Sequence, residues 1–181
     1  LISGDLGGRS GHLPAIESPP PADVLLLEST YGATPTHRSF RDARTELFSR
    51  VREAVATSTP VLIPTFAMGR AQEILQVFRE REDELPDQAE IVYDGMITDT
   101  TRAYHAFASA PWVNDAITNY RLESGGTEPF LPDGARTPET MADRESIFSQ
   151  SGTPIIVAPS GMLTGGWSPY YLWQLTEQVD A

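Results

Sequence analysis

Two acidic residues occupy positions where a carboxylate could do chemistry. Asp5 lies in the sequence Ser-Gly-Asp-Leu-Gly, a turn that follows a short apolar segment. There it could offer its oxygens to a hard cation or bridge two metal ions, or it could cap the turn through its own backbone. Glu28 ends the apolar run 24–27, where it could orient a histidine or lie exposed at a strand end. The local sequence favours turn capping for Asp5 and leaves both interpretations of Glu28 open.

Two glycine-containing blocks have the pattern of an anion-binding turn. Residues 63–73 read as a strand, a turn and a helix start, so the helix N-terminus could bind a phosphate beside the Arg70 guanidinium. Alternatively, Arg70 pairs with a nearby acid such as Glu73. Residues 158–166 have the same order, and glycines such as Gly161, next to Ser160, would let a ligand approach the backbone. Such turns are common, so neither block alone identifies a ligand.

The histidines are His12, His37 and His105, and none forms a His-x-His or His-x-x-x-His pair. The chain therefore cannot build a three-histidine zinc site by itself. His105 falls among aromatic residues of a predicted helix and is interpreted as structural. His37 lies between an apolar run and a helix, and it is the better candidate for a functional role.

The apolar pattern predicts the elements that would position these residues. Continuous apolar runs are typical of strands buried on both faces, whereas steps of three and four indicate amphipathic helices. Strands are expected at 24–27, 60–64, 90–93 and 154–158, helices at 39–55, 69–81, 98–108, 138–150 and from 168, and a loop at 124–138. This alternation predicts an α/β domain with a mainly parallel sheet flanked by helices. Asp5, Glu28, residues 65–66 and Ser160 all follow a strand, which predicts one shared face.

Composition narrows the class of protein. The chain has 13 basic residues, all of them arginine, against 25 acidic ones, for a net charge of −12. Such a surface is typical of a salt-rich cytoplasm, where the Debye length falls to ~3 Å, although a GC-rich genome would also replace lysine by arginine. A strong excess of acidic residues argues against a nucleic acid as the partner. Residues 1–70, however, hold seven arginines and seven acids, so the excess acid lies in the rest of the chain.

Other features of the sequence exclude whole classes of protein and of site. Without cysteine there is no disulfide scaffold, thiolate metal site or thiol nucleophile. No apolar run approaches the ~18 residues of a membrane span and no signal peptide is visible, so no membrane association and a cytoplasmic location are expected. The first residues have the pattern of a strand end and the last lie within a helical pattern, so we expect a fragment of a longer protein.

Four blocks together resemble the β-CASP branch of the metallo-β-lactamase superfamily, especially the archaeal homologues of the cleavage and polyadenylation endonuclease subunit. The blocks are Ser3-Gly4-Asp5, Leu27 to Gly32, Ile63 to Glu73 and Pro159 to Gly166, in that order. The resemblance implies the end of a metallo-β-lactamase domain at 1–32 and a β-CASP domain at 33–181, incomplete at its C-terminus. It also implies hydrolysis of RNA at two zinc ions.

In this resemblance Asp5 would bridge the two metals, and Glu28 would hold a histidine near them. Arg70, Ser160 and Gly161 would contact the RNA, and His37 is a further candidate for substrate contact. The family's upstream His-x-His-x-Asp-His motif and its two later histidine motifs are absent. The chain alone should therefore bind zinc poorly and lack activity.

Several alternatives stay open. The parent could cleave within an RNA chain or from its 5′ end, and its substrate could be DNA. It could be a non-catalytic scaffold of an RNA-processing complex, and it could form a homodimer. Without the resemblance, the chain would be an α/β anion-binding domain, in which replacing Asp5 affects only local stability.

Overall fold

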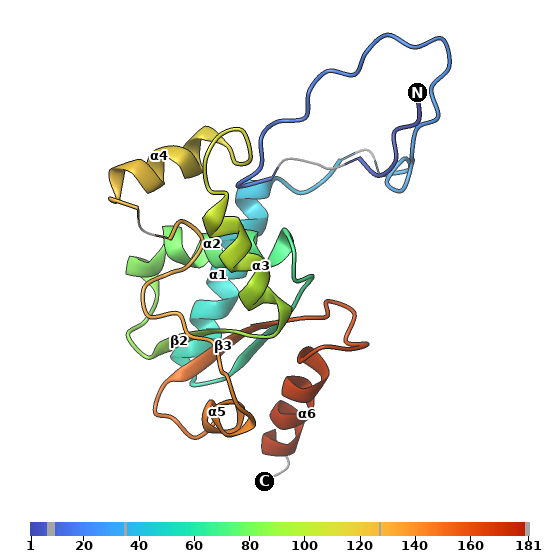
Figure 1. Cartoon of the computed structure of the whole chain (residues 1–181). Coiled ribbons are helices and arrows are strands. Elements are labelled where there is room, and N and C mark those ends of the chain that lie inside the picture. The colour runs from blue at the N-terminus through green and yellow to red at the C-terminus, as the bar shows by residue number, and fades with distance from the viewer. Residues whose placement is uncertain (7–9, 35, 127, 180–181) are drawn as a thin grey trace.

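The computed structural model describes residues 1–6, 10–34, 36–126 and 128–179, and its centre is a small parallel sheet. The strands are β1 (Val61–Pro64), β2 (Ala89–Tyr93) and β3 (Thr153–Ala158), in the order β1-β3-β2. Val61 pairs with Ile155 on one side of β3, and Ala89 pairs with Thr153 on the other. All six residues of the central β3 are buried. The predicted α/β class with a parallel sheet is confirmed (Figure 1).

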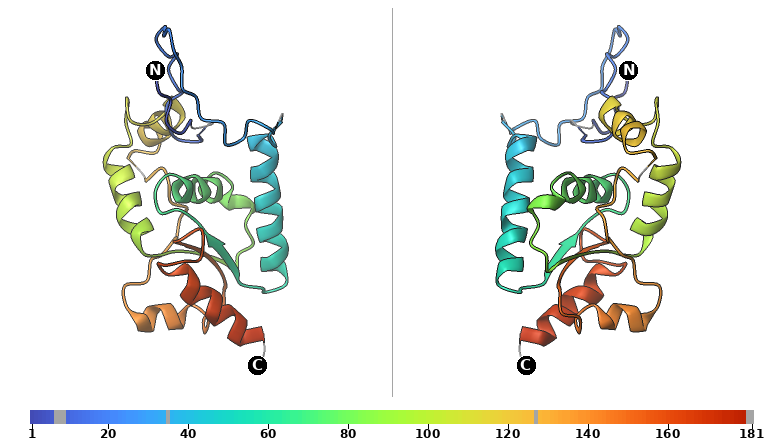
Figure 2. Two further views of the ribbon diagram at one scale, coloured as in Figure 1. Left: turned by 90° about the vertical axis from the view of Figure 1, so that its right-hand side faces the viewer. Right: turned by 90° about the vertical axis from the view of Figure 1, so that its left-hand side faces the viewer.

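Helices cover both faces of this sheet. One face, called the upper face here, is covered by α1 (Phe40–Ala56), α2 (Arg70–Glu80) and α3 (Met96–Ala106). The other, lower face is covered by α5 (Met141–Ser146) and α6 (Ser168–Val179), which lie below the sheet in Figure 2. A short 3-10 helix, η1 (Glu82–Glu84), follows α2, and α4 (Asp115–Glu123) lies beside α3.

The strands divide their side chains between two cores, because successive residues point to opposite faces. Ile155 and Val157 of β3 pack with Phe48 of α1 and Phe78 of α2 on the upper face. Ile156 packs on the lower face, in a cluster with Val92, Ile147, Ala158 and Tyr171. A third, smaller cluster under α4 contains Ala108, Val113, Ile117 and Phe130.

Local signals explain where most helices begin. The Ser39 side chain accepts a hydrogen bond from the Asp42 backbone N–H at 3.0 Å, so it caps α1 where the helix was expected to begin. The predicted start of a helix at Pro138 is wrong, because Thr140 and Asp143 form a capping box and α5 begins at Met141. Helix α4 was not predicted, and it lies between two segments of irregular structure.

The interpretation of residues 24–27 as a strand buried on both faces is wrong. The segment makes one isolated parallel bridge, between Leu26 and Ile2. Val24 and Leu26 remain 70% and 62% exposed, because Ile2 is their one strand neighbour and nothing in the described part of the chain packs over them. Much of the stretch 10–34 projects beyond the N-terminal end of α1, at the end of the molecule away from α6 (Figures 1 and 2).

Helices long and apolar enough to cross a membrane do not occur in the described ranges.

Candidate functional site

Three connections meet where the parallel strands end at their carboxyl edge, as expected for a ligand site in such a sheet. They are residues 65–69 after β1, 94–95 after β2 and 159–166 after β3. A Cβ added to Gly161 would lie 3.3 Å from the Thr65 backbone, and one added to Gly95 would lie 3.2 Å from Pro159. One face was predicted for Asp5, Glu28, residues 65–66 and Ser160, and the loops that carry residues 65–66 and Ser160 do lie together at this edge.

The turn 159–166 is closed by its own hydrogen bonds. The Ser160 backbone N–H donates to the Gly165 carbonyl at 2.9 Å, and the Thr164 backbone N–H donates to the Ser160 hydroxyl at 3.2 Å. The Ser168 hydroxyl donates to the Ser160 carbonyl at 2.7 Å. Gly166 has φ +66°, and a Cβ there would approach the Pro159 carbonyl oxygen to 2.5 Å. Ser160 thus organises the turn through its backbone N–H, its hydroxyl oxygen and its carbonyl.

The connection 65–69 is tied to two helices rather than left free. Gly69 has φ +79°, and its backbone N–H donates to the Gln72 side chain at 2.7 Å. The fully buried Gln72 side chain in turn donates to the Ala67 carbonyl and to Thr101. Arg70 donates to Glu73 at 2.5 Å, the pairing considered as the alternative to an anion site. Its side chain is nevertheless 63% exposed, so it can reach a passing anion.

A buried ion pair, missed by the sequence analysis, supports this edge from below. Arg144 donates to both carboxylate oxygens of Asp94 at 2.8 Å, and the Tyr171 hydroxyl donates to the same carboxylate at 2.7 Å. The guanidinium also stacks on the Trp167 ring at 3.8 Å. Burial, followed by the bond to Asp94, raises the pKa of Tyr171 far above its ordinary value, so the hydroxyl stays a donor. Asp94 directly follows a strand, which is the signal that could have found it.

Asp5 and Glu28 form a second group. The Ser3 backbone N–H donates to the Leu26 carbonyl at 2.9 Å, and the Glu28 backbone N–H donates to the Ser3 hydroxyl at 3.0 Å. This pairing brings the turn of Asp5 next to Glu28. The Glu28 carboxylate accepts from the Thr30 backbone N–H at 2.8 Å, and this bond is the main reason why its pKa is lowered. Asp5 itself is exposed.

The two groups are separate in this chain, so the prediction of one shared face is wrong for Asp5 and Glu28. No hydrogen bond or ion pair within the described ranges joins residues 3–5 or Glu28 to the sheet edge. His37 belongs with the Glu28 group, because its ring lies 5.1 Å from that of Tyr31. No cluster of three or more metal-ligating side chains occurs in the part of the chain that the structure describes.

A junction connects the segment after Asp5 to the helical body. The Gly11 backbone N–H donates to Glu73 at 3.3 Å, and its carbonyl accepts from Gln76 at 3.2 Å and from Asn114 at 3.0 Å. His12 is buried beside Phe130, with ring centroids 5.6 Å apart. The block 69–73 thus contacts both the sheet edge and the segment that carries Asp5.

Comparisons with known proteins agree with this arrangement. Residues 71–180 match the Beta-Casp domain family. The chain is 34% identical over 167 residues to ribonuclease TTHA0252 of Thermus thermophilus, and the match covers 92% of the chain and 38% of that protein. It is 32% identical to transcription termination factor FttA of Methanococcus maripaludis, covering 97% of the chain and 28% of the relative. It is also 32% identical to RNase aCSPSF2 of Saccharolobus solfataricus, covering 90% and 29%.

The chain thus spans between about a quarter and two fifths of the length of these relatives. The family match covers more than half of the chain, and each likeness extends over nearly all of it. The chain therefore belongs to the β-CASP family of the metallo-β-lactamase superfamily.

Proposed function

We propose that this chain is part of a hydrolase that cleaves phosphodiester bonds of RNA. The observation that carries the proposal is a likeness to a named ribonuclease that covers 92% of the chain. The names of two further relatives, a transcription termination factor and an RNase, fit the cutting of a transcript. The compartment proposed for this reaction is the cytoplasm.

Within this proposal, residues 1–32 belong to the lactamase domain and residues from 33 onward to the β-CASP domain. Asp5 contributes one carboxylate to a site for two zinc ions whose other ligands lie outside the described residues. Such ions lower the pKa of a bound water and so supply a nucleophile. The exposure of Asp5 and its place beside Glu28 support this role, because a ligand must be free to meet a metal.

Glu28 has a charge suited to orienting a neighbouring group. Its carboxylate is held by the Thr30 backbone N–H, and this bond favours the ionised form and so lowers the pKa of Glu28. We assign it the role of holding a histidine near the metals. His37, next to Tyr31, then borders the same site.

RNA would pass along the carboxyl edge of the sheet. Arg70 is an exposed cation there, and Ser160 and Gly161 present a hydroxyl and a backbone without a Cβ. In a salt-rich cytoplasm, counterion release would add little affinity, so directed contacts of this kind become more important. The homodimer stays a prediction.

The competing proposal is a non-catalytic scaffold that retains the fold. The presence of both Asp5 and Glu28 favours an enzyme, because a scaffold has no need to keep an exposed carboxylate in that turn. The two proposals differ in what a single substitution does to RNA cleavage.

The test is Asp5→Ala in the full-length protein, with Asp23→Ala as a matched control, since both carboxylates are exposed in the same segment. Substitutions at exposed sites usually change stability by less than about 0.5 kcal/mol. We expect Asp5→Ala to abolish cleavage of single-stranded RNA with an unchanged melting temperature, and Asp23→Ala to cleave normally. Normal cleavage by Asp5→Ala would overturn the assignment.

A further inference from the structure

Four large apolar side chains are displayed on the carboxyl edge of the sheet. They are Phe66 (63% exposed), Met68 (69%), Met96 (68%) and Met162 (72%). Phe66 and Met68 belong to the connection after β1, Met96 begins α3 and Met162 lies in the turn after β3. Single exposed apolar residues need no explanation, but a group on contiguous loops marks an interaction surface.

The loops that carry these side chains are held in place. The Gly161 contact with Thr65 joins the first loop to the third, and Gly95 packs against Trp167 and Pro159. The Thr100 hydroxyl donates to the Ala67 carbonyl at 2.7 Å, which fixes the first loop to α3. The four side chains therefore extend from a preorganised edge, so a ligand would not have to order these loops when it binds.

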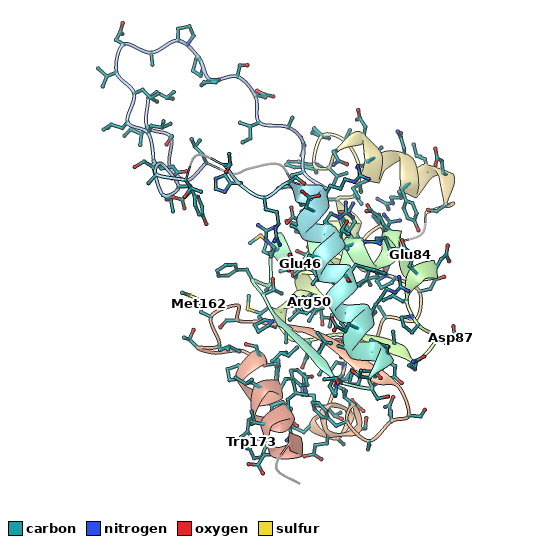
Figure 3. All side chains as sticks on the ribbon, turned by 180° about the vertical axis from the view of Figure 1, so that it is seen from behind. Glu46, Arg50, Glu84, Asp87, Met162 and Trp173 are labelled. Carbon is teal, nitrogen blue, oxygen red and sulfur yellow. The ribbon has the colours of Figure 1, made fainter. Side chains whose placement is uncertain are left out.

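Among the residues that the structure describes, the edge carries no unpaired carboxylate, although the chain has 25 acidic residues. Residues 54–72 and 146–176 contain no aspartate or glutamate. Asp94 in the connection after β2 is 1% exposed and paired with Arg144, and Asp99, one turn into α3, pairs with Arg102. Figure 3 shows Met162 on the opposite side of the molecule from Glu84 and Asp87.

This distribution identifies the kind of partner. A polyanion is repelled by most of a surface with net charge −12, and it can approach where carboxylates are missing and Arg70 is exposed. Aromatic rings stack on any nucleobase, and methionine thioethers adapt to irregular apolar partners. A double helix hides its base faces, whereas a single strand offers them. Charge and apolar character together therefore match single-stranded nucleic acid.

We propose that the edge formed by Phe66, Met68, Met96 and Met162 is a nucleobase platform for single-stranded RNA. A base stacks on the Phe66 ring, neighbouring bases contact the methionines, and Arg70 meets the phosphate between them. The proposal rests on RNA as the substrate of the parent protein. It gives a salt-tolerant mode of binding, because base stacking releases no counterions, while Arg70 contributes about −0.7 to the slope of log K against log salt.

The test uses the full-length protein and a fluorescent, nuclease-resistant phosphorothioate single-stranded RNA, with the dissociation constant measured from 0.1 to 1 M salt. We expect Phe66→Ala to weaken binding at least about fivefold, the lower end for loss of one base stack, with the salt slope unchanged. Phe66→Trp should restore binding. Phe107→Ala is the matched control, since Phe107 is an equally exposed aromatic residue (58%) at the other end of α3, and it should leave binding unchanged.

Each outcome separates the possibilities. If the wild type binds RNA and Phe66→Ala and Met162→Ala bind equally well, the platform is overturned while the RNA substrate stands. A Phe66→Ala variant that binds RNA normally but has a lower melting temperature shows that another part of the parent protein covers this edge. That result also overturns the proposal of a nucleobase platform. Phe66→Leu keeps the apolar volume and serves if the alanine variant does not fold. If the wild type binds no RNA, the proposed function itself fails.

Discussion

Replacement of Arg144 by methionine tests how the sheet edge is stabilised. The guanidinium donates twice to Asp94 at 2.8 Å, with side chains only 9% and 1% exposed. Methionine keeps much of the apolar volume beside Trp167 but removes the charge. Asp94 would retain the Tyr171 hydroxyl and the Gly95 backbone N–H, and its negative charge would lie buried without a cation.

The magnitude follows from that burial. Removing one partner of a buried ion pair costs about 3–5 kcal/mol, a large share of the ~5–15 kcal/mol that stabilises a typical domain. The matched control is Arg102→Met, because Arg102 contacts Asp99 at 3.2 Å with side chains 76% and 81% exposed. Screening by water limits such a surface pair to about 0–1 kcal/mol.

Urea unfolding of the chain, followed by tryptophan fluorescence, measures both variants. We expect Arg144→Met to lower the unfolding free energy by at least about 3 kcal/mol at 0.1 M and at 1 M salt, because a buried pair is poorly screened. Combining it with Asp94→Asn should cost less than the sum of the two single changes, since no buried charge is then left alone. A loss below about 1 kcal/mol, or strict additivity, would refute the reasoning.

Two further predictions concern the turn 159–166 and the buried histidines. Gly166→Ala should destabilise the chain by at least about 1 kcal/mol in the same urea assay, because the new Cβ would lie 2.5 Å from the Pro159 carbonyl oxygen and the residue has φ +66°. The control Gly165→Ala should leave the unfolding free energy unchanged, because a Cβ there has open space. Equal effects of the two substitutions would contradict the close approach at Gly166. Burial lowers the pKa of His12 and His105 below 6.5, so the unfolded chain binds more protons than the folded chain at mildly acidic pH. The unfolding free energy should therefore fall as the pH drops through 6.5, and it should fall less steeply in a His12→Gln variant. An unchanged slope in that variant would contradict the role of His12.

The sequence predicts the central sheet well, for a physical reason. Runs such as 154–158 are apolar at every position, and a strand covered on both faces requires that pattern. The run 24–27 has the same pattern but is exposed, since an apolar run shows what must be buried in the whole protein and not whether the covering layer is present. Local hydrophobicity alone cannot distinguish the two cases.

Helix α4 escapes prediction because tertiary contacts decide it. Among its residues Ile117 alone is buried, so no apolar face repeats along the sequence. The Asn114 side chain caps the helix by accepting from the Ile117 backbone N–H at 3.1 Å, and Phe130 packs against Ile117 from a distant loop. The packing of Phe130 is a nonlocal contact that periodicity does not reveal.

For the candidate site, the sequence identifies loops better than partners. The rule that ligands lie past the carboxyl ends of strands correctly placed residues 65–66 beside the turn that carries Ser160, because a Cβ on Gly161 would lie 3.3 Å from the Thr65 backbone. The same rule wrongly placed Asp5 and Glu28 on that face, since they form a separate group. Applied to Asp94, the same rule would have found the carboxylate but not the buried pair. Its partner Arg144 lies 50 residues away, and no local signal connects them.

Hydrolysis of single-stranded RNA by the full-length protein tests the central claim most directly. The protein would be incubated with labelled RNA as purified, after treatment with a chelator, and after zinc is added back. The account predicts cleavage that is lost on chelation and restored by zinc, because a carboxylate such as Asp5 acts there as a metal ligand. Intact RNA in all three samples, from a folded protein that binds it, would contradict the account and favour a scaffold.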